Sequence, residues 1–275
     1  MPDTATLELR NVHLVYNRGK ADEVTALRHI DLVAEAGQFI TIAGSNGAGK
    51  SSMVQTVAGA VRPTSGRVLI DGRDVTRWPD YRRAGLIARV FDDPRTGSAP
   101  ELSIEDNLAL AMSRGRRRTL RFSLSSRRRR TMREHLSRLG LGLEDRLHDR
   151  VGLLSAGQRQ SLTMVMAGLA APRVLLLDEH LAALDPNTAR RVLDLTGELV
   201  SEIGCTTLMI THNMEHALSM GTRLLVMSRG EIVADIAHET KQGMVTQDVI
   251  DLMVGLGDTL SDRTLLPELA MEVGR

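Results

Sequence analysis

A glycine-rich stretch between a strand-like and a helix-like segment constrains the fold of this chain most strongly. Residues 44–51 are Gly-Ser-Asn-Gly-Ala-Gly-Lys-Ser, the Gly-x-x-x-x-Gly-Lys-Ser spacing of a phosphate-binding loop. Gln38–Ala43 before it is short, apolar and β-branched, and Ser52–Ala60 after it has a helical pattern. Small residues let backbone N–H groups turn towards a polyphosphate, and the helix N-terminus adds partial positive charge. The stretch therefore predicts an α/β nucleotide-binding fold.

The residues of this loop have distinct predicted roles. Lys50 is expected to contact the β- and γ-phosphates of a bound nucleotide, and the Ser51 hydroxyl is expected to hold Mg²⁺. Lysine is rare in this chain, with three lysines among 35 basic residues, so composition does not explain a lysine at position 50. The other predicted nucleotide contacts are Gly44, Ser45, Asn46, Gly47, Ala48, Gly49 and Ser52.

Bulk properties set wide limits. A chain of 275 residues can bury a large core, and its net charge of +1 implies no polyanionic partner. The single cysteine, Cys205, lies in an apolar segment and is expected to be a buried thiol in a reduced, cytosolic protein. The N-terminal sequence lacks the pattern of a signal peptide, and no run approaches the ~20 apolar residues of a membrane span. Work at a membrane would therefore require a partner.

The order of the predicted elements indicates an antiparallel β layer beside a parallel α/β core, with an inserted helical subdomain. Strands are predicted at Thr6–Tyr16, Val24–Ala34, Gln38–Ala43, Gly66–Asp71, Leu86–Phe91, Val174–Leu177, Thr206–Ile210 and Arg223–Met227. Helices are predicted at Ser52–Ala60, Ile104–Met112, Met132–Leu139, Gln158–Ala170, Asn187–Ile203 and Met214–Met220. Residues 258–275 are predicted to form a loosely held tail.

A second acidic motif complements the phosphate loop. Val174–Leu177 is a buried-strand pattern that delivers Asp178 to its end, where the carboxylate is expected to hold Mg²⁺. The adjacent Glu179 is a candidate general base or water-positioning group for hydrolysis. The alternative, a paired carboxylate that caps the following turn, fits the apolar strand and the upstream loop less well.

Four further elements resemble the motifs of ABC-type ATPases. Leu154–Gln158, Leu-Ser-Ala-Gly-Gln, is similar to the Leu-Ser-Gly-Gly-Gln signature, although Ser155 and Gln158 also have the spacing of a simple capping box. Ala183–Asp185 resembles the D-loop, His212 the switch histidine, and Tyr16 the aromatic residue on which adenine stacks. Because these elements and the two motifs above occur in family order, the chain is identified as resembling that family over roughly residues 5–255.

The resemblance implies a P-loop NTPase (RecA-like) core with an antiparallel β subdomain and an α-helical subdomain. It implies one domain at 5–257, with 5–91 and 159–257 as the core and 92–158 as the helical subdomain. It also implies that two copies pack head to tail around two ATP molecules. Each site would then combine residues of both copies: Lys50, Ser51, Asp178, Glu179 and His212 of one with Ser155, Gly157 and Gln158 of the other, and Asp185 nearby.

The chain departs from the family pattern at three positions. Asp92, in Val-Phe-Asp-Asp-Pro, stands where the family has a glutamine that contacts Mg²⁺ or the attacking water. A carboxylate can still bind a hard cation, but it is shorter and adds negative charge, so slower or less coupled hydrolysis is expected. Ala156 replaces a signature glycine, and His180 replaces a proline; no clustered partner suggests that His180 binds a metal.

An arginine-rich segment is the compositional outlier. Residues 114–133 contain ten arginines and no acidic residue. Three interpretations remain open: a solvated helical surface, which we favour, a lipid-facing surface, or a nucleic-acid contact. Phe122 is the only aromatic residue in the segment, so it offers little stacking for single strands.

The resemblance implies an ATP-hydrolysing transporter subunit, most similar to bacterial solute importers with amino-acid-like substrates. Its expected partners are a second copy, a separate transmembrane permease and a solute-binding protein, at the cytoplasmic face of the plasma membrane. The alternatives are a soluble ABC ATPase that acts on nucleic acid, the ribosome or cofactor assembly, and a regulatory ATPase with weak catalysis. Nucleic-acid binding is not expected, since long coiled-coil insertions and a second cassette are not visible in the sequence.

Overall fold

The computed structural model describes residues 5–115, 125–182 and 184–255. The chain forms two compact units: unit 2 is Trp78–Thr207, and unit 1 holds the residues before and after it. The predicted tail at 258–275 lies outside the described residues, and the predicted limits of the helical subdomain, 92–158, stay a prediction. No helix in the described ranges is both long enough and apolar enough to cross a membrane.

Four strands of unit 1 form an antiparallel sheet in the order β2-β1-β4-β5. They are β1 (Ala5–Tyr16), β2 (Val24–Glu35), β4 (Ser65–Ile70) and β5 (Arg73–Asp74). In β1 the buried apolar residues change from odd positions (Leu7, Leu9) to even positions (Val12, Leu14). The change falls at Asn11, whose φ is +49° and where the register with β2 shifts, as at a β-bulge. The predicted antiparallel layer is therefore present.

The second sheet of unit 1 positions the glycine-rich loop. β3 (Phe39–Gly44) runs parallel to β9 (Arg223–Ser228), which forms an antiparallel pair with β10 (Glu231–Ile236). β8 (Thr206–Ile210), whose last three residues belong to unit 1, neighbours β3 on its other side. All six residues of β3 are buried, which explains its continuous apolar sequence.

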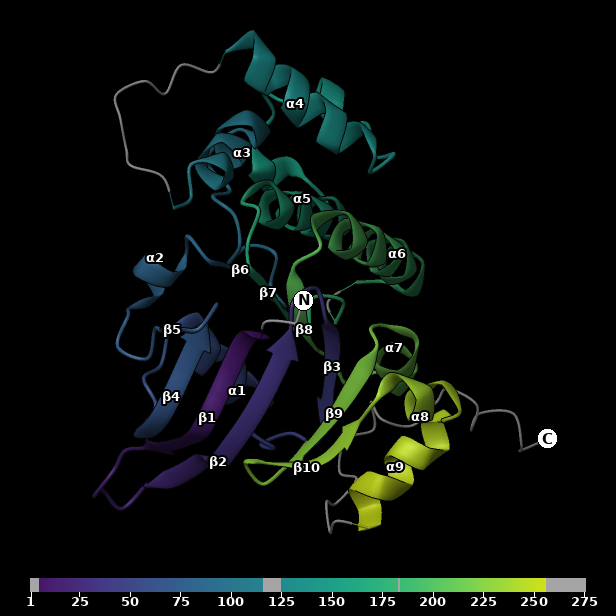
Figure 1. The fold of residues 1–275 in the computed structure, drawn as a ribbon. Helices are drawn as coiled ribbons and strands as arrows, with labels where there is room; N and C mark the ends of the chain where they lie inside the picture. The colour runs from purple at the N-terminus through teal and green to yellow at the C-terminus, as the bar shows by residue number, and fades with distance from the viewer. Residues whose placement is uncertain (1–4, 116–124, 183, 256–275) are drawn as a thin grey trace, which may run out of the picture. The chain divides into compact units, whose positions relative to one another are not determined.

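Four helices of unit 1 accompany this sheet: α1 (Lys50–Ala58), α7 (Met214–Ser219), α8 (His238–Gln242) and α9 (Thr246–Gly255). In Figure 1 the last three lie beside β9 and β10. Met214 and Ala217 of α7 and Val249 of α9 join one apolar cluster with Leu224 and Val226 of β9. The C-terminal helices thus complete the core that supports β3.

Lys241 of α8 is a charged residue inside this core, 3% exposed. Its Nζ donates to the Met220 carbonyl, to the Gly221 carbonyl at 3.2 Å, and to the Thr41 hydroxyl of β3 at 3.2 Å. Burial lowers the pKa of Lys241 to about 8. The ammonium group therefore ties the C-terminal helices to the strand that precedes the loop.

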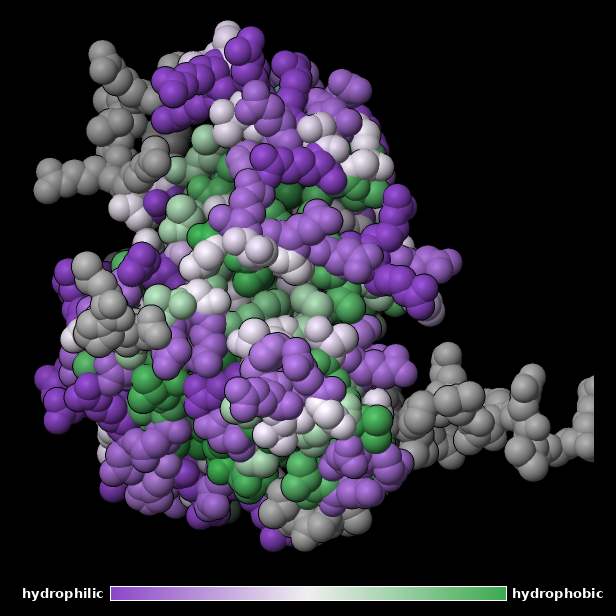
Figure 2. Space-filling model, turned by 45° about the vertical axis from the view of Figure 1, so that its right-hand side comes forward, coloured by the Kyte–Doolittle hydropathy of each residue, from purple (hydrophilic) through white to green (hydrophobic). Residues whose placement is uncertain are grey.

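Unit 2 is built around α5 (Ala156–Leu169). It also contains α2 (Asp80–Arg83), β6 (Ile87–Val90), α3 (Ile104–Met112), α4 (Ser126–Ser137), β7 (Val174–Asp178), α6 (Pro186–Ile203) and the 3₁₀ turns Leu143–Asp145 and Val151–Leu153. Leu162 and Val165 of α5 pack with Leu108 of α3 and Met132 and Leu136 of α4 in one apolar cluster. β6 runs parallel to β7. Figure 2 shows that the surface over α4, found by its place in Figure 1, is mostly hydrophilic.

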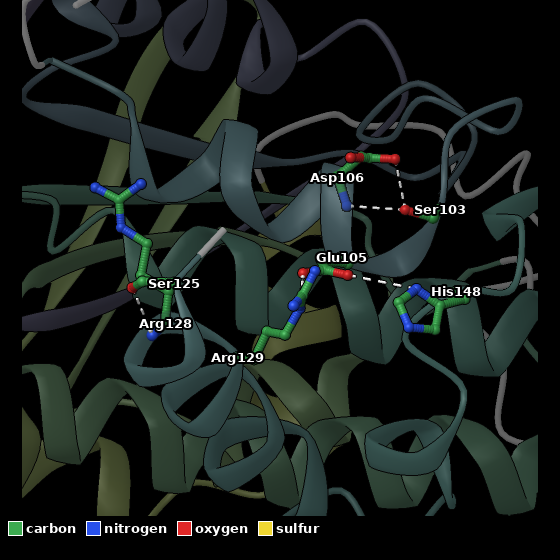
Figure 3. A network of polar contacts seen from close by, with 7 residues as sticks. All are labelled: Ser103, Glu105, Asp106, Ser125, Arg128, Arg129 and His148. Atoms are coloured by element: carbon green, nitrogen blue, oxygen red, sulfur yellow. Dashed lines mark hydrogen bonds and ion pairs between the residues drawn. The ribbon is translucent and has the colours of Figure 1, made fainter. Parts of the chain in front are cut away.

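One carboxylate ties α4 to α3. Glu105 of α3 is 3% exposed; its Oε1 accepts from Nε of Arg129 at 2.6 Å, and its Oε2 lies 3.4 Å from Nδ1 of His148 (Figure 3). Ser125 caps α4 by accepting from the Arg128 N–H at 3.4 Å. Of the arginine-rich segment, residues 116–124 lie outside the described residues. Within α4, Arg127, Arg130 and Arg133 are exposed, whereas Arg129 is used in this internal ion pair.

The structure corrects several predicted elements. α1 begins at Lys50 instead of Ser52, because Gly49 takes the left-handed conformation at the N-cap. α4 begins at Ser126 instead of Met132, since four arginines precede its first apolar residue and hide the helical period. Five further elements, α2, β5, β10, α8 and α9, were not predicted.

Candidate functional site

The glycine-rich loop follows β3 and wraps the N-terminus of α1. Gly47 and Gly49 have φ of +80° and +100°, which other residues rarely adopt. A Cβ atom at Gly44 would lie 2.3 Å from the Met227 carbonyl oxygen, and one at Gly49 would lie 2.6 Å from the Ala26 carbonyl oxygen. The loop therefore needs glycine both for its turns and for close backbone packing.

Lys50 is the first residue of α1 and is 4% exposed. Its Nζ donates to the carbonyl oxygens of Gly44 and Ser45 at 2.7 and 2.9 Å, so its charge is held over the loop. Ser51 is exposed. The Tyr16 hydroxyl lies 3.4 Å from Oγ of Ser52, which brings this aromatic residue of β1 to the first turn of α1.

His212 belongs to the same unit. It follows β8, and the preceding Thr211 N–H donates to the Ile42 carbonyl of β3 at 3.3 Å. The histidine therefore leaves the sheet beside the strand that leads into the glycine-rich loop. Unit 1 thus brings together Tyr16, residues 44–52 and the segment that carries His212.

The acidic pair lies at the end of β7 in unit 2. All five residues of β7 are buried, and Asp178 is its last residue, 9% exposed. Nη2 of Arg89 donates to Oδ2 of Asp178 at 2.5 Å. Glu179 follows with φ of +50°, a conformation that is uncommon for residues other than glycine. Since the Glu179 carbonyl accepts from the Ala182 N–H at 3.0 Å, a tight turn holds this conformation.

The predicted signature opens α5. Ser155 is the N-cap: its Oγ accepts from the Gln158 N–H at 3.2 Å, and Oε1 of Gln158 accepts from the Ser155 N–H at 3.1 Å. A Cβ atom at Gly157 would lie 2.2 Å from Cγ2 of Thr188. The capping box is therefore confirmed, and contact with Thr188 at the start of α6 leaves no room for a side chain at Gly157.

A groove of about 360 Å³ runs along this end of α5. Ser155, Gly157 and Gln158 line it together with α6 residues that include Thr188 and Arg191. Asp185 is the N-cap of α6, and its carboxylate accepts from the Thr188 N–H at 3.1 Å. Hydrogen bonds to Thr188 lower the pKa of Asp185, so the cap is a carboxylate at neutral pH. Ala183, assigned to the same motif, lies outside the described residues.

Asp92 follows β6 and is exposed. Behind it, Nε2 of Gln160 in α5 donates to the Phe91 carbonyl at 3.1 Å, and a Cβ at Gly97 would lie 3.2 Å from Cγ2 of Thr163. Helix α5 therefore supports the backbone on both sides of Asp92 and exposes the carboxylate.

Two residues considered for metal binding or nucleophilic chemistry, His180 and Cys205, are buried. His180 is 1% exposed and its Nε2 lies 3.1 Å from the Thr196 hydroxyl. No group of three or more His, Cys, Asp or Glu side chains suited to a metal occurs in the described ranges. Cys205 is buried as predicted, and burial raises the pKa of its thiol, which makes the thiol a poor nucleophile.

The predicted site residues thus fall in two groups. Unit 1 holds Tyr16, Gly44, Ser45, Asn46, Gly47, Ala48, Gly49, Lys50, Ser51, Ser52 and His212, and unit 2 holds Asp92, Ser155, Gly157, Gln158, Asp178, Glu179 and Asp185. Sequence reasoning missed Arg89 and Thr188. A signal for Arg89 was present, because a charge inside the apolar strand Leu86–Phe91 requires a partner.

Comparisons with known proteins give concordant results. A family model described as "ABC transporter" matches residues 27–182. The tyrosine transport ATP-binding protein of Clostridioides difficile is 37% identical over 246 residues, 89% of this chain and 97% of that protein. The methionine import ATP-binding protein MetN of Corynebacterium efficiens is 34% identical over 237 residues, 82% of this chain and 61% of that protein. The chain therefore spans about three fifths of that second relative.

Solved structures share the fold. The ATP-binding cassette MJ0796, in a dimeric post-hydrolysis state bound to ADP and Pi, has a TM-score of 0.71 and 27% sequence identity. The match covers 84% of this chain and 98% of that one. The ADP conformation of the cassette MJ1267 has a TM-score of 0.72 at 22% identity, and covers 91% and 99% of the two chains. The predicted fold, an α/β P-loop NTPase core with antiparallel and helical parts, is confirmed.

Proposed function

The chain belongs to the ABC transporter family and is an ATPase, and from this premise we propose that it powers a bacterial importer of small amino-acid-like solutes. The observation that carries the proposal is the tyrosine transport ATP-binding protein, which is 37% identical over 97% of its own length. A methionine import ATP-binding protein is among the other relatives, but so are spermidine/putrescine and thiamine import proteins. The resemblance therefore supports import more strongly than it supports one solute.

ATP binding rests on the glycine-rich loop. Backbone N–H groups of residues 44–49 and the α1 N-terminus offer donors and positive potential to the phosphates. Lys50, already at the loop, exchanges its carbonyl partners for phosphate oxygens. The Tyr16 ring, near the first turn of α1, stacks on adenine.

Mg²⁺ is the cofactor that this chemistry requires. The Ser51 hydroxyl and the Asp178 carboxylate would hold it, and Asp92 is a third candidate ligand. The donor set fits a hard cation, because all three are oxygen ligands and Asp178 already attracts the cationic Arg89. Bound there, Mg²⁺ would supply charge stabilisation for phosphoryl transfer. Glu179 accepts the proton of the attacking water, and His212 stabilises the reacting phosphate by a hydrogen bond.

The working form is a head-to-tail dimer. The α5 N-terminus offers the exposed Ser155 and backbone N–H donors to an anion. In the dimer these groups of one copy face the γ-phosphate held by the other copy, while Asp185 lies near the interface. The dimeric state of MJ0796 supports this arrangement. Hydrolysis then loosens the dimer and produces movement.

The proposed partners are a separate permease and a solute-binding protein, with the ATPase at the cytoplasmic face of the plasma membrane. The segment around Asp92–Leu102, exposed at Asp92, is the proposed docking surface for the permease. The test is reconstitution with the permease from neighbouring genes in proteoliposomes that contain ATP. ATP-dependent uptake of an amino acid, lost in Lys50→Ala, supports the proposal. ATPase activity with no permease associated in mild detergent contradicts it.

The competing function is a soluble ABC ATPase that acts on nucleic acid. The observation in its favour is α4, where Arg127, Arg130 and Arg133 are exposed. Nucleic-acid affinity with a steep dependence on salt, lost when these three arginines become glutamine, would favour it. Binding that is weak and unchanged in the triple variant leaves α4 as a solvated surface.

A further inference from the structure

The ion pair between Arg89 and Asp178 follows from the register of two neighbouring strands. Arg89 of β6 lies opposite Leu176 of β7, so Asp178, two residues further on, is on the same face as Arg89 and diagonal to it. An arginine reaches this distance easily, and its Nη2 donates to Oδ2 of Asp178 at 2.5 Å. The two side chains are 17% and 13% exposed, so water screens the pair only weakly.

The guanidinium group of Arg89 is held in place on a second side. Its Cζ lies 4.5 Å from the centroid of the Phe91 ring, a cation–π contact within the same strand end. Its Nε is buried and makes no hydrogen bond to any residue that the structure describes. An arginine can bind a carboxylate at two points through Nε and Nη2 together. Here only Nη2 contacts Asp178, and the Nε donor is not used. Arg89 is therefore positioned to neutralise Asp178 without enclosing its carboxylate.

We propose that Arg89 is the resident counter-cation of Asp178 and competes with Mg²⁺ for this carboxylate, so that it sets the Mg²⁺ requirement of the ATPase. The proposal rests on the proposed function, in which Asp178 holds Mg²⁺. One carboxylate then faces two cations, a tethered monovalent one and a free divalent one. When Mg²⁺ is absent, Arg89 compensates the negative charge of Asp178 at the end of β7. When Mg²⁺ is present, the positive charge of Arg89 opposes binding of the metal ion. Arg89 is a positioning residue, since it acts through Asp178.

The experiment measures metal affinity rather than turnover. Mn²⁺ is titrated into the ADP-saturated protein, and free Mn²⁺ is followed by electron paramagnetic resonance. Arg89→Met keeps most of the apolar stem and removes the charge, so the half-saturating Mn²⁺ concentration should fall roughly tenfold. Arg89→Gln, which keeps a neutral donor, should also lower it and serves if the methionine variant does not fold. Arg133→Met, on the exposed face of α4, is the matched control and should leave it unchanged.

A second readout is stability without metal. In EDTA, Arg89→Met should lower the melting temperature, because Asp178 loses its counter-cation, and Mn²⁺ with ADP should restore more stability than in the wild type. In an Asp178→Asn background, the Arg89 substitution should change neither the melting temperature in EDTA nor the stabilisation by Mn²⁺ with ADP. If both Arg89 variants bind ADP normally but bind Mn²⁺ no more tightly than the wild type, the inference about Arg89 is wrong and the proposed function is unaffected. If wild type and Lys50→Ala bind ADP equally, the proposed nucleotide site itself is wrong.

Discussion

Replacing Gly157 with alanine is expected to destabilise unit 2 through one methyl group. The new Cβ would lie 2.2 Å from Cγ2 of Thr188, whereas non-bonded carbon atoms pack at about 3.5–4.0 Å. Relief of the contact requires a different χ1 rotamer of Thr188 or a shift of the start of α6, where the Thr188 N–H is bonded to Asp185.

The expected magnitude combines two opposing effects. Overpacking of this kind costs about 1–3 kcal/mol, and alanine favours the helix over glycine by up to about 1 kcal/mol. Because the contact is much shorter than van der Waals distance, we expect the clash to dominate. The free energy of unfolding of Gly157→Ala should therefore fall by about 1–2 kcal/mol.

The assay is urea unfolding followed by circular dichroism, with Thr188→Ser as the relieving background. Serine removes Cγ2 and leaves Cβ and the hydroxyl oxygen at 3.5 and 3.6 Å from the new methyl group, which are ordinary contacts. Gly157→Ala in this background should cost nothing or stabilise slightly, while Thr188→Ser alone should cost less than about 1 kcal/mol. If alanine costs the same in both backgrounds, contact with Thr188 is not the reason for glycine.

Three other predictions address catalysis and pH. Glu179→Gln should lower ATP turnover by roughly 100-fold or more but keep ATP binding, so that an ATP-bound dimer becomes visible in gel filtration. Equal ATP turnover in the variant and the wild type would instead favour a regulatory ATPase with weak catalysis. Asp92→Gln should raise turnover or its stimulation by the permease, and unchanged rate, Mg²⁺ dependence and stimulation would refute a restraining role for Asp92. The pKa of Lys241 is about 8 in the folded protein and 10.5 in the unfolded chain. Between these pH values the unfolded chain therefore binds more protons than the folded protein. The free energy of unfolding should consequently rise with pH, by up to about 3 kcal/mol. Lys241→Met should remove this rise in urea titrations at pH 7.5 to 10.5, and a rise of the same size in the variant would assign it to other groups.

The nucleotide-binding elements were predictable because their signals are local. The strand before the loop, the glycines and Asp178 at the end of an apolar strand each occupy fewer than ten consecutive residues. The order of six such elements led to the ABC-type ATPase, and the family match confirms this identification. The substrate, the dimer and the individual site roles stay predictions, since they depend on other chains or on bound nucleotide.

The features that escaped prediction depend on long-range register or on backbone conformation. Arg89 and Asp178 are 89 positions apart and meet only because β6 and β7 pair in one particular register. The left-handed φ of Glu179 has no residue signature, because glycine is the usual marker of that conformation. The start of helix α4, before Met132, escaped because arginines replace the apolar period in its first turn.

The close approach of Gly44 to β9 has a consequence for biosynthesis. Gly44 pairs with Met227 across the parallel strands, and the Gly230 N–H donates to the Ala48 carbonyl at 3.0 Å. The glycine-rich loop is translated early, but the strand and turn that brace it leave the ribosome about 180 residues later. A nascent chain that ends before Gly230 lacks these braces. We therefore expect capture of ATP to be a late event in synthesis.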